Sequence, residues 1–445
     1  HSFIPDVARA GARAVLTERS SVDVPAGVAV LYVPNLEKAL DTIVPFFYDY
    51  PARAMRVVGI TGTNGKTTTS YLVRAILRHA GRRVGLIGTI QAMIEDEVLP
   101  TSNTTPDIIV LQQMLAEMRT RGMDAVVMEV SSHALALGRV AGIEFDTAVF
   151  TNLTQDHLDF HKTMENYARA KAHLFELVSA PGAKEGKTAV LNADDAASET
   201  MRAYTRCPII TYGVDHSADL TAQDVQLACD GMELTLMHGG KRLFHLHTGI
   251  TGLFNVHNVL AAVGASLAEH VAATDIAVAL TAFAGVPGRF ELVREGQDFA
   301  VIVDYAHTPD GMENVLRTAR AVTKGRIIAV FGCGGDRDRT KRPIMGRIGA
   351  EMADIAILTS DNPRTEDPAA IVDEVERGVL PVIGDKPYEK IVDRRTAIFH
   401  AIGRAQAGDT VVILGKGHET YQILKDGTIH FDDREQAREA IRSRA

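Results

Sequence analysis

The chain has few cysteines, no long apolar run and no long run of basic residues, and each absence excludes a class of protein. The three cysteines, Cys207, Cys229 and Cys333, lie far apart and lack the spacing of a metal site, which is typical of a reducing cytoplasm. No stretch reaches the roughly eighteen apolar residues of a transmembrane helix, so we expect no membrane insertion. No signal peptide is visible either. A net charge of −9 argues against a general nucleic-acid or membrane-surface binder.

What remains is the composition of an ordinary cytoplasmic globular protein. The 445 residues are 46% apolar and 23% charged, and this length suffices for about three domains. The sequence begins at His1 without a methionine, in a segment typical of the middle of a domain, HSFIPDVARAGARAVL. We therefore expect further residues upstream.

The sequence is organised around residues 56–81, RVVGITGTNGKTTTSYLVRAILRHAG. A short apolar run predicts a buried strand, a glycine-rich loop follows, and apolar residues then recur at helical spacing. Backbone N–H groups at such a helix start bind phosphate. Lys66 can reach the β- and γ-phosphates, and the Thr67 hydroxyl can ligate Mg²⁺. The strict phosphate-loop pattern is not met, because Ile60 stands where its first glycine belongs.

The order of predicted elements divides the chain into three domains. Residues 1–52 predict a small, incomplete α/β piece, with helices at 8–14 and 36–50 and short strands at 14–17 and 28–33. Residues 53–285 alternate strand and helix, which predicts a mostly parallel sheet with helices on both faces and an antiparallel insert at 218–249. The Pro/Gly segment VPGRFE marks the next boundary, and residues 286–445 resume the βα alternation as a second doubly wound domain.

Three chemically active side chains are expected near the carboxyl ends of the first sheet's strands, where ligands of open α/β sheets bind. Glu129 closes an apolar strand, and a buried carboxylate is costly unless it is paired or ligates a cation such as Mg²⁺. His157 follows Asp156 beyond the next strand, and Lys171 lies in the middle of a helix. Taken singly, they also fit a salt-bridged acid, a surface histidine and a snorkelling lysine.

Four loops follow strands of the last domain. They read DYAHTPD, GCGGDRDRTKRP, SDNPRTEDP and LGKGHE. An Arg and Asp/Glu set around one crevice can hold a zwitterion, with its carboxylate on arginine and its ammonium on an acid. FGCGGD alone is a weak dinucleotide signal, because no fingerprint spacing follows.

Together these motifs resemble those of the Mur ligase family, over residues 3 to about 435. The motifs are TGTNGKTT, EVSSHALALGRV, FTNLTQDHLDFH, NYARAKAHLF, FNVHNVLAA, PGRFE, DYAHTPD, GCGGDRDRTKRP, DNPR and GKGHE. The resemblance implies an α/β fold of three domains: a central P-loop ATPase-like domain with a mostly parallel sheet, a Rossmann-like C-terminal domain and an incomplete N-terminal domain. The family's uridine-binding segment is expected upstream of His1.

The resemblance also implies residue roles. ATP is expected to bind Gly62, Thr63, Asn64, Gly65, Lys66, Thr67, Thr68, Asn258, Arg289 and Asp304. Catalysis is expected from Lys66, Glu129, His157 and Lys171. One Mg²⁺ is expected on Thr67 and Glu129 and a second on His157 and a carbamylated Lys171, since a carbamate supplies anionic oxygen ligands. The muramoyl dipeptide is expected on Asn103, Thr104, Thr105, Ser131 and Arg139. The incoming amino acid is expected on Arg337, Asp361, Asn362, Pro363, Arg364, Gly415 and Glu419.

The implied activity is ATP-dependent ligation of meso-diaminopimelate to UDP-N-acetylmuramoyl-L-alanyl-D-glutamate by a cytoplasmic monomer, through an acyl phosphate, in peptidoglycan synthesis. DNPR is the family's signature for diaminopimelate, which argues against the alternatives of a lysine-adding enzyme and a folylpolyglutamate synthetase. A third alternative is a P-loop regulator without ligase chemistry. Leu137 departs from the pattern, because some relatives place a substrate-contacting Gln there.

Overall fold

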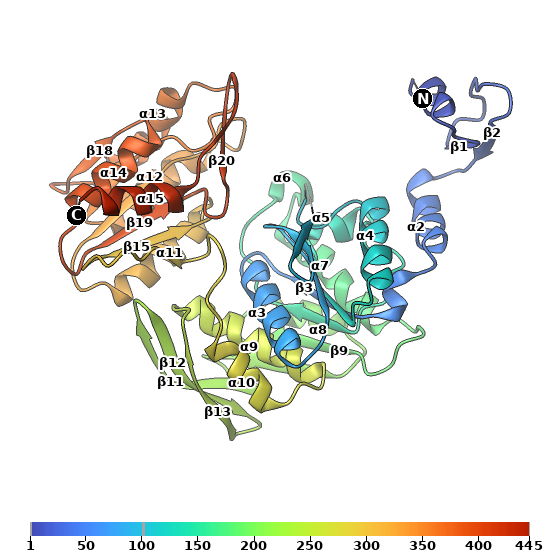
Figure 1. Ribbon diagram of the computed structural model, residues 1–445, viewed down its shortest axis with the longest axis horizontal. Coiled ribbons are helices and arrows are strands. Elements are labelled where there is room, and N and C mark those ends of the chain that lie inside the picture. The colour runs from blue at the N-terminus through green and yellow to red at the C-terminus, as the bar shows by residue number, and fades with distance from the viewer. Residues whose placement is uncertain (1, 100–102, 445) are drawn as a thin grey trace.

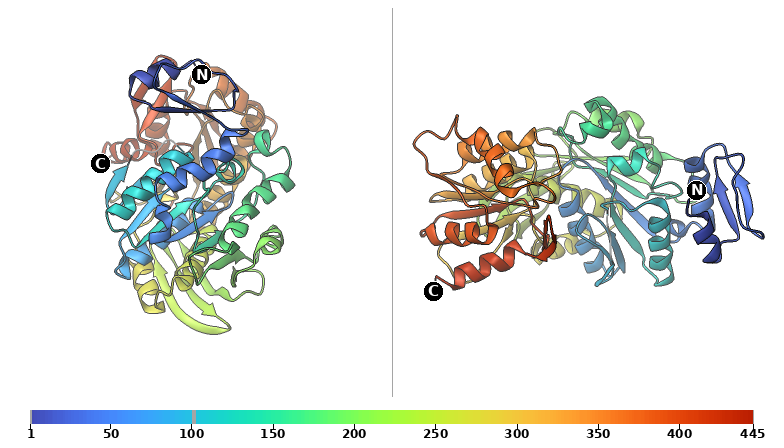
Figure 2. Two further views of the ribbon diagram at one scale, coloured as in Figure 1. Left: turned by 90° about the vertical axis from the view of Figure 1, so that its right-hand side faces the viewer. Right: turned by 90° about the horizontal axis from the view of Figure 1, so that it is seen from above.

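The computed structural model of the chain describes residues 2–99 and 103–444. The molecule is elongated, and its two termini lie toward opposite ends of the long axis (Figure 1; Figure 2). Two large α/β bodies follow one another along this axis. We call the body built on the larger sheet the central body and the other the C-terminal body.

An eleven-stranded sheet forms the central body, in the order β13-β12-β11-β10-β9-β8-β3-β7-β4-β5-β6. The run from β11 to β4 is parallel, whereas β12, β13, β5 and β6 add antiparallel ends. The strands are β3 (Arg56–Thr61), β4 (Val84–Ile87), β5 (Ala92–Ile94), β6 (Glu97–Leu99), β7 (Ala125–Glu129), β8 (Thr147–Phe150), β9 (Thr188–Asn192), β10 (Ile209–Gly213), β11 (Leu220–Ala228), β12 (Gly231–His238) and β13 (Lys241–Thr248).

Helices cover both faces of this sheet and bury its apolar residues in two cores. One core packs against α3 (Lys66–His79), α9 (Leu253–Ala268) and α10 (Ala273–Thr281). The other packs against α4 (Ile108–Thr120), α5 (Ser132–Ala136), α7 (Met164–Ser179) and α8 (Ser198–Tyr204). A short helix, α6 (Leu158–His161), precedes α7. Among the described residues, no helix is both long and apolar enough to cross a membrane.

The C-terminal body is a six-stranded sheet, β14-β15-β19-β16-β17-β18, parallel except at β14. Its strands are β14 (Glu291–Leu292), β15 (Ala300–Asp304), β16 (Ile327–Phe331), β17 (Ile355–Leu358), β18 (Tyr388–Lys390) and β19 (Thr410–Leu414). One face packs against α11 (Pro309–Val322), α12 (Lys341–Met352) and α13 (Pro368–Val379), and the other against α14 (Arg394–Arg404) and α15 (Asp433–Arg442). A separate hairpin pairs β20 (Tyr421–Leu424) with β21 (Gly427–His430).

A small N-terminal piece extends beyond the central body (Figure 2). It holds α1 (Ile4–Arg9), a parallel pair of β1 (Ala14–Thr17) and β2 (Ala29–Tyr32), α2 (Leu36–Phe47) and a 3₁₀ turn, η1 (Pro51–Ala54). The prediction of a helix at 8–14 was wrong, because the helix lies earlier, with a proline in its first turn, and residues from Ala14 pair in a strand.

The alternation of strands and helices confirms the predicted α/β class and the antiparallel insert. The run Thr104, Thr105 and Pro106 predicts a helix start, and this prediction was wrong. Asp107 caps α4 instead, accepting hydrogen bonds from the amides of Ile109 and Val110, so residues 103–106 lie in a loop before the helix. The edge strands β5 and β6 were not predicted, and neither was the β20–β21 hairpin. The domain boundaries at 52 and 285 stay predictions.

Candidate functional site

The loop between β3 and α3 wraps closely around the strand end and is held by the segment after β8. Gly62 has φ +151°, and a Cβ there would lie 1.8 Å from the Thr151 hydroxyl oxygen. The Thr63 amide donates to the Asn152 carbonyl at 2.9 Å, and the Asn64 amide donates to the Asn152 side chain at 2.9 Å. These contacts hold the loop in place before the start of α3, where the helix dipole favours the binding of an anion.

Glu129 is fully buried at the end of β7 and lies beside this loop. The Thr67 hydroxyl donates to its Oε2 at 3.1 Å. Thr89, directly after β4, donates its amide to Oε1 at 2.9 Å and its hydroxyl to Oε2 at 3.0 Å. Among the described residues, three hydroxyl or amide donors and no cationic side chain hold this carboxylate, so its charge is available to a metal ion.

Two lysines share one backbone carbonyl at the loop. Lys66 Nζ donates to the Gly62 carbonyl at 2.8 Å, and Lys171 Nζ donates to the same oxygen at 2.7 Å. Burial lowers the pKa of both ammonium groups, and the pKa of Lys171 falls well below its usual value, helped by the charge of Lys66. Lys171 also lies 4.4 Å from the centre of the Tyr167 ring. Because a lowered pKa favours the uncharged, nucleophilic form of the amine, Lys171 fits the chemistry that a carbamate requires.

His157 lies at the same end of the sheet, in the left-handed conformation with φ 54°. Its Nε2 is 3.3 Å from the Asp156 carboxylate, and its ring centre is 6.1 Å from that of Tyr167, on which Lys171 also lies. Burial lowers the pKa of His157, and Asp156 opposes the shift. The neutral imidazole suits a metal ligand.

Among the described residues, no three His, Cys, Asp or Glu side chains gather into a ready metal cluster. The donors present are one carboxylate beside one hydroxyl, Glu129 and Thr67, and one imidazole near a buried amine, His157 and Lys171. The oxygens of Glu129 and Thr67 are ligands that Mg²⁺ uses when nucleotide phosphates and water complete its shell, and a carbamate on Lys171 would supply oxygens beside His157. The residues therefore fit the metal, provided that a nucleotide is bound.

The nucleotide residues predicted outside the loop come from both bodies. Asn258 on α9 packs against the loop, and a Cβ on Gly65 would lie 2.4 Å from its Oδ1. Arg289 reaches across from the C-terminal body, with Nη2 3.4 Å from the Thr67 hydroxyl and its guanidinium over the Tyr305 ring. Asp304 at the end of β15 accepts the Phe290 amide at 2.6 Å. It thus fixes the segment that carries Arg289.

The residues predicted for the muramoyl dipeptide gather around Thr105. Its hydroxyl donates to the Glu129 carbonyl at 2.9 Å and accepts the Ser131 amide at 3.0 Å, and Arg139 donates to its carbonyl at 3.1 Å. The Thr104 hydroxyl is 3.0 Å from that of Thr89. Leu137 is exposed nearby, at the end of α5.

The predicted amino-acid residues form a second cluster, in the C-terminal body. Asn362 donates to Glu419 Oε2 at 2.9 Å. Asp361 lies against Gly415, where a Cβ would come within 2.4 Å of its Oδ2. Arg364, with φ 52°, donates to the Gly335 carbonyl at 2.8 Å. Pro363 is buried against the same glycine loop.

Arg337 is the predicted residue that stands apart. It is exposed, and its guanidinium donates to the carbonyl of Asp336 at 3.0 Å. Within the part of the chain that the structure describes, no acid lies in ion-pair distance of Arg337 or Arg364, so both guanidinium groups remain available to a carboxylate.

A cavity of about 680 Å³ joins the two clusters. Its central-body wall includes Thr89 and Thr104, which connect to Glu129, and its C-terminal wall includes Tyr305, Glu419 and Tyr421. The full lining is Thr89, Ile90, Gln91, Asn103, Thr104, Pro287, Tyr305, His418, Glu419, Thr420, Tyr421 and Arg434. One ligand-sized space therefore lies between the phosphate loop's carboxylate and the amino-acid cluster.

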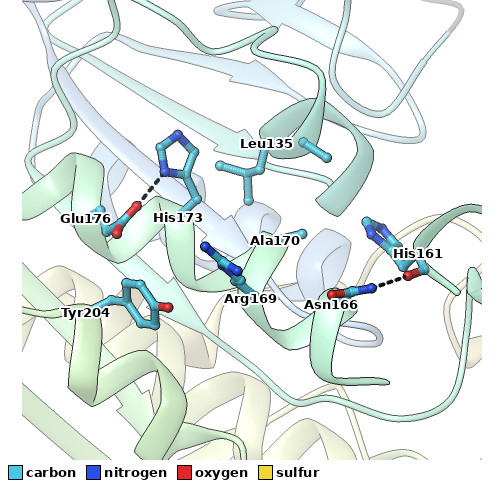
Figure 3. A pocket seen from close by; sticks show the side chains of 9 residues that line it. Leu135, His161, Asn166, Arg169, Ala170, His173, Glu176 and Tyr204 are labelled. Carbon is cyan, nitrogen blue, oxygen red and sulfur yellow. Dashed lines mark hydrogen bonds and ion pairs between the residues drawn. The ribbon is translucent and has the colours of Figure 1, made fainter. Parts of the chain in front are cut away.

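A second cavity, of about 380 Å³, lies between α5, α7 and α8 (Figure 3). Asn166, Arg169 and His173 project towards it from α7, and His173 pairs with Glu176 at 2.8 Å. None of the predicted site residues lines it.

Sequence reasoning missed side chains that line the first cavity or support the residues around it. Thr89 carried the same signal as Glu129, a polar residue directly after a buried strand, but was not singled out. Asp310, in the first turn of α11, lies 2.7 Å from Asn64 of the phosphate loop and bridges the two bodies. Lys416 is fully buried beside Glu419.

Comparison with known proteins agrees with this architecture. The model of the Mur ligase middle domain matches residues 60–266, and that of the Mur ligase glutamate ligase domain matches residues 288–417. A Bacillus cereus protein named UDP-N-acetylmuramoyl-L-alanyl-D-glutamate–2,6-diaminopimelate ligase is 49% identical over 446 residues, covering 100% of this chain and 89% of that protein.

Solved structures give the same result. A structure of a UDP-N-acetylmuramoyl-L-alanyl-D-glutamate–2,6-diaminopimelate ligase superposes with a TM-score of 0.70 at 34% identity, covering 100% of this chain and 89% of the other. The MurF ligase of Thermotoga maritima, solved in complex with ADP, shares the fold with a TM-score of 0.67 at 19% identity, covering 100% and 92%. From the matched domains and the full-length identity, the chain belongs to the Mur ligase family.

Proposed function

We propose that the chain is an ATP-dependent ligase that joins the amine of meso-diaminopimelate to the D-glutamyl carboxylate of UDP-N-acetylmuramoyl-L-alanyl-D-glutamate. The relatives that carry this name share half of its residues over its whole length. We place the reaction in cytoplasmic peptidoglycan precursor synthesis and assign it to a monomer.

The cavity between the two bodies is the observation that carries this proposal. The carboxylate that accepts the phosphoryl group must lie between the phosphate loop and the attacking amine. The cavity wall connects to Glu129 through Thr89 on one side and holds Glu419 on the other. Holding two reactants in one such space supplies much of the rate of a ligation.

At the phosphate end, the loop amides and Lys66 bind the terminal phosphates of ATP, and Arg289 reaches the same position beside Thr67. Mg²⁺, when bound, offsets the charge of the transferring phosphoryl group. Glu129 and Thr67 would hold one ion, and His157 and a carbamylated Lys171 the second. The amine of Lys171 forms the carbamate by adding CO₂ with loss of a proton.

The reaction then has two steps. An oxygen of the D-glutamyl carboxylate attacks the γ-phosphorus, so that an acyl phosphate forms and ADP leaves. The amine of diaminopimelate attacks the acyl carbon, loses a proton and expels phosphate. Lys66 and Arg289 stabilise the negative charge on the phosphoryl oxygens in the first step.

At the amino-acid end, Arg364 and Glu419 lie on either side of Asn362. Arg364 contacts the Asn362 carbonyl at 3.4 Å, and Glu419 accepts its side-chain amide at 2.9 Å. A guanidinium and a carboxylate at this spacing bind a carboxylate and an ammonium of one ligand. Diaminopimelate carries both groups at each end, whereas lysine ends in an ammonium alone.

The test measures phosphate release with ATP, the UDP-linked dipeptide and one of three acceptors: meso-diaminopimelate, lysine or glutamate. We expect diaminopimelate to be used far better than the others, and Arg364→Ala to lose diaminopimelate binding in calorimetry. Preference for lysine would overturn the assignment of Arg364, and preference for glutamate would favour a folylpolyglutamate synthetase. Absence of ligation with intact nucleotide binding would favour a P-loop regulator.

A further inference from the structure

Lys416 is a buried cation to which the proposed reaction gives no role. It follows β19 and is 0% exposed. Removing an ammonium from water costs several kcal/mol unless the group is paired and hydrogen-bonded. A lysine at this position therefore needs compensating partners, and these lie in the amino-acid cluster.

Lys416, Glu419 and Asn362 each form hydrogen bonds with the other two side chains. Lys416 Nζ donates to Glu419 Oε2 at 2.9 Å and to Asn362 Oδ1 at 3.1 Å. Asn362 Nδ2 donates to the same Oε2 at 2.9 Å. The Ile423 amide, on the unpredicted hairpin, also donates to Asn362 Oδ1 at 2.9 Å. Because Oδ1 accepts from two N–H donors, the orientation of this amide is fixed.

These hydrogen bonds also determine which oxygen of Glu419 is available to a ligand. Oε2 accepts from both Lys416 and Asn362, whereas Oε1 has no hydrogen-bond partner among the described residues. The Glu419 side chain is 14% exposed and lines the cavity between the two bodies. One oxygen of the carboxylate is therefore committed to the protein, and the other is left for a ligand on a residue that lines the cavity.

The charge of Glu419 is balanced before any ligand arrives, because Lys416 pairs with it at 2.9 Å. The other buried charges nearby, Arg394 and Asp433, pair with each other at 2.6 Å. A paired Glu419 offers no excess negative charge to a lone ammonium, whereas Arg364 and Arg337, which have no acid within ion-pair distance among the described residues, match the carboxylate at the zwitterionic end of an amino acid.

We propose that Lys416 is a specificity-determining residue: by neutralising Glu419 it makes the cluster accept an acceptor that ends in both a carboxylate and an ammonium, and reject one that ends in an ammonium alone. This inference rests on the proposed ligase function. Lys416 acts through Glu419 and does not itself touch the acceptor.

The test compares kcat/KM for meso-diaminopimelate and for lysine in Lys416→Met and Lys416→Gln, both neutral, and in Lys416→Arg, which keeps the charge. The matched control is Lys425→Met, since Lys425 is an exposed lysine in the β20–β21 turn. We expect the preference for diaminopimelate over lysine to fall about tenfold or more in both neutral variants, the effect of one nearby charge. It should persist in Lys416→Arg and Lys425→Met.

A merely structural role predicts a different result, in which both acceptors lose the same factor and the preference stays constant. That outcome in the neutral variants would overturn the inference, as would loss of preference in Lys416→Arg with a wild-type thermal midpoint. If Lys416→Met does not fold, Lys416→Gln and Lys416→Arg carry the comparison. Failure of the wild-type chain to ligate either acceptor would instead refute the proposed function itself.

Discussion

The two ends of the cavity differ in how their buried cationic side chains are paired. At the phosphate loop, Lys66 and Lys171 both donate to the carbonyl of Gly62, and neither has a carboxylate within ion-pair distance among the described residues. In the C-terminal body each buried cation already has an acid: Lys416 with Glu419, Arg342 with Glu366, and Arg394 with Asp433. In the described part of the chain, the two lysines of the first region have no ion-pair partner, whereas the buried cations of the second are already paired.

This difference follows from the ligands that the regions are proposed to bind. ATP and a carbamate bring several negative charges, so unpaired lysines and helix amides gain most when these arrive. An amino acid brings both signs, so its site needs charges that are fixed in place and balanced. The phosphate end is therefore completed by its ligand, whereas the amino-acid end is preorganised by the protein.

The largest effect is expected from a substitution at the phosphate end. Lys171→Ala should reduce ligation on the order of a thousandfold, because no carbamate can form and added bicarbonate restores nothing. Carbon-13 NMR of the wild-type chain in labelled bicarbonate should show a carbamate signal that this variant lacks. The control is Lys162→Ala, an exposed lysine before α7, which should keep both signal and turnover. Near-normal turnover in Lys171→Ala would end the carbamate role.

A smaller effect on the reaction, but a larger one on stability, is expected from Arg394→Ala. Arg394 holds Asp433 at 2.6 Å, the Leu414 carbonyl at 3.0 Å and the Ser360 carbonyl at 3.3 Å. The two carbonyls stand at the roots of the loops that carry Glu419 and Asn362. Removing one partner of a fully buried pair costs about 3–5 kcal/mol, measurable by urea unfolding.

The neighbouring residue supplies the control for that experiment. Arg395 pairs with Glu439 on the surface, and Arg395→Ala should change stability far less. Arg394→Ala should also weaken diaminopimelate binding while leaving ATP binding within about twofold, because the phosphate loop lies on the other body. Equal losses in the two Arg variants would show that the amino-acid end is not organised around this buried pair.

The sequence was sufficient to predict the secondary structure of residues 56–81. The strand, the glycine turn and the helix start are local in sequence, and Glu129 reveals itself as an acid in an apolar strand. The sequence was less informative where contacts between residues far apart in the chain determine the structure. Thr89 and Glu129 lie 40 positions apart but share two hydrogen bonds. No local pattern indicated that Lys416 pairs with Glu419 or that a β20–β21 hairpin supports Asn362.

Local features of the chain explain the other structural details that were not predicted. Pro106 and Asp107 delay the start of α4, so that Thr104 and Thr105 stay in a loop beside Glu129. The left-handed backbone of His157 and of Arg364 could not be read from residue type, because neither is glycine or asparagine. Both residues belong to the candidate site, where strained backbone is common.

The most direct test of this account follows one oxygen atom. The account requires the D-glutamyl carboxylate to attack the γ-phosphorus of ATP and phosphate to leave only when the amine of diaminopimelate replaces it. With ¹⁸O in that carboxylate, mass spectrometry should find one labelled oxygen in the released phosphate for each amide bond formed. Unlabelled phosphate beside newly formed amide would contradict the acyl phosphate, and with it the assignment of the cavity as the place where the two ends meet.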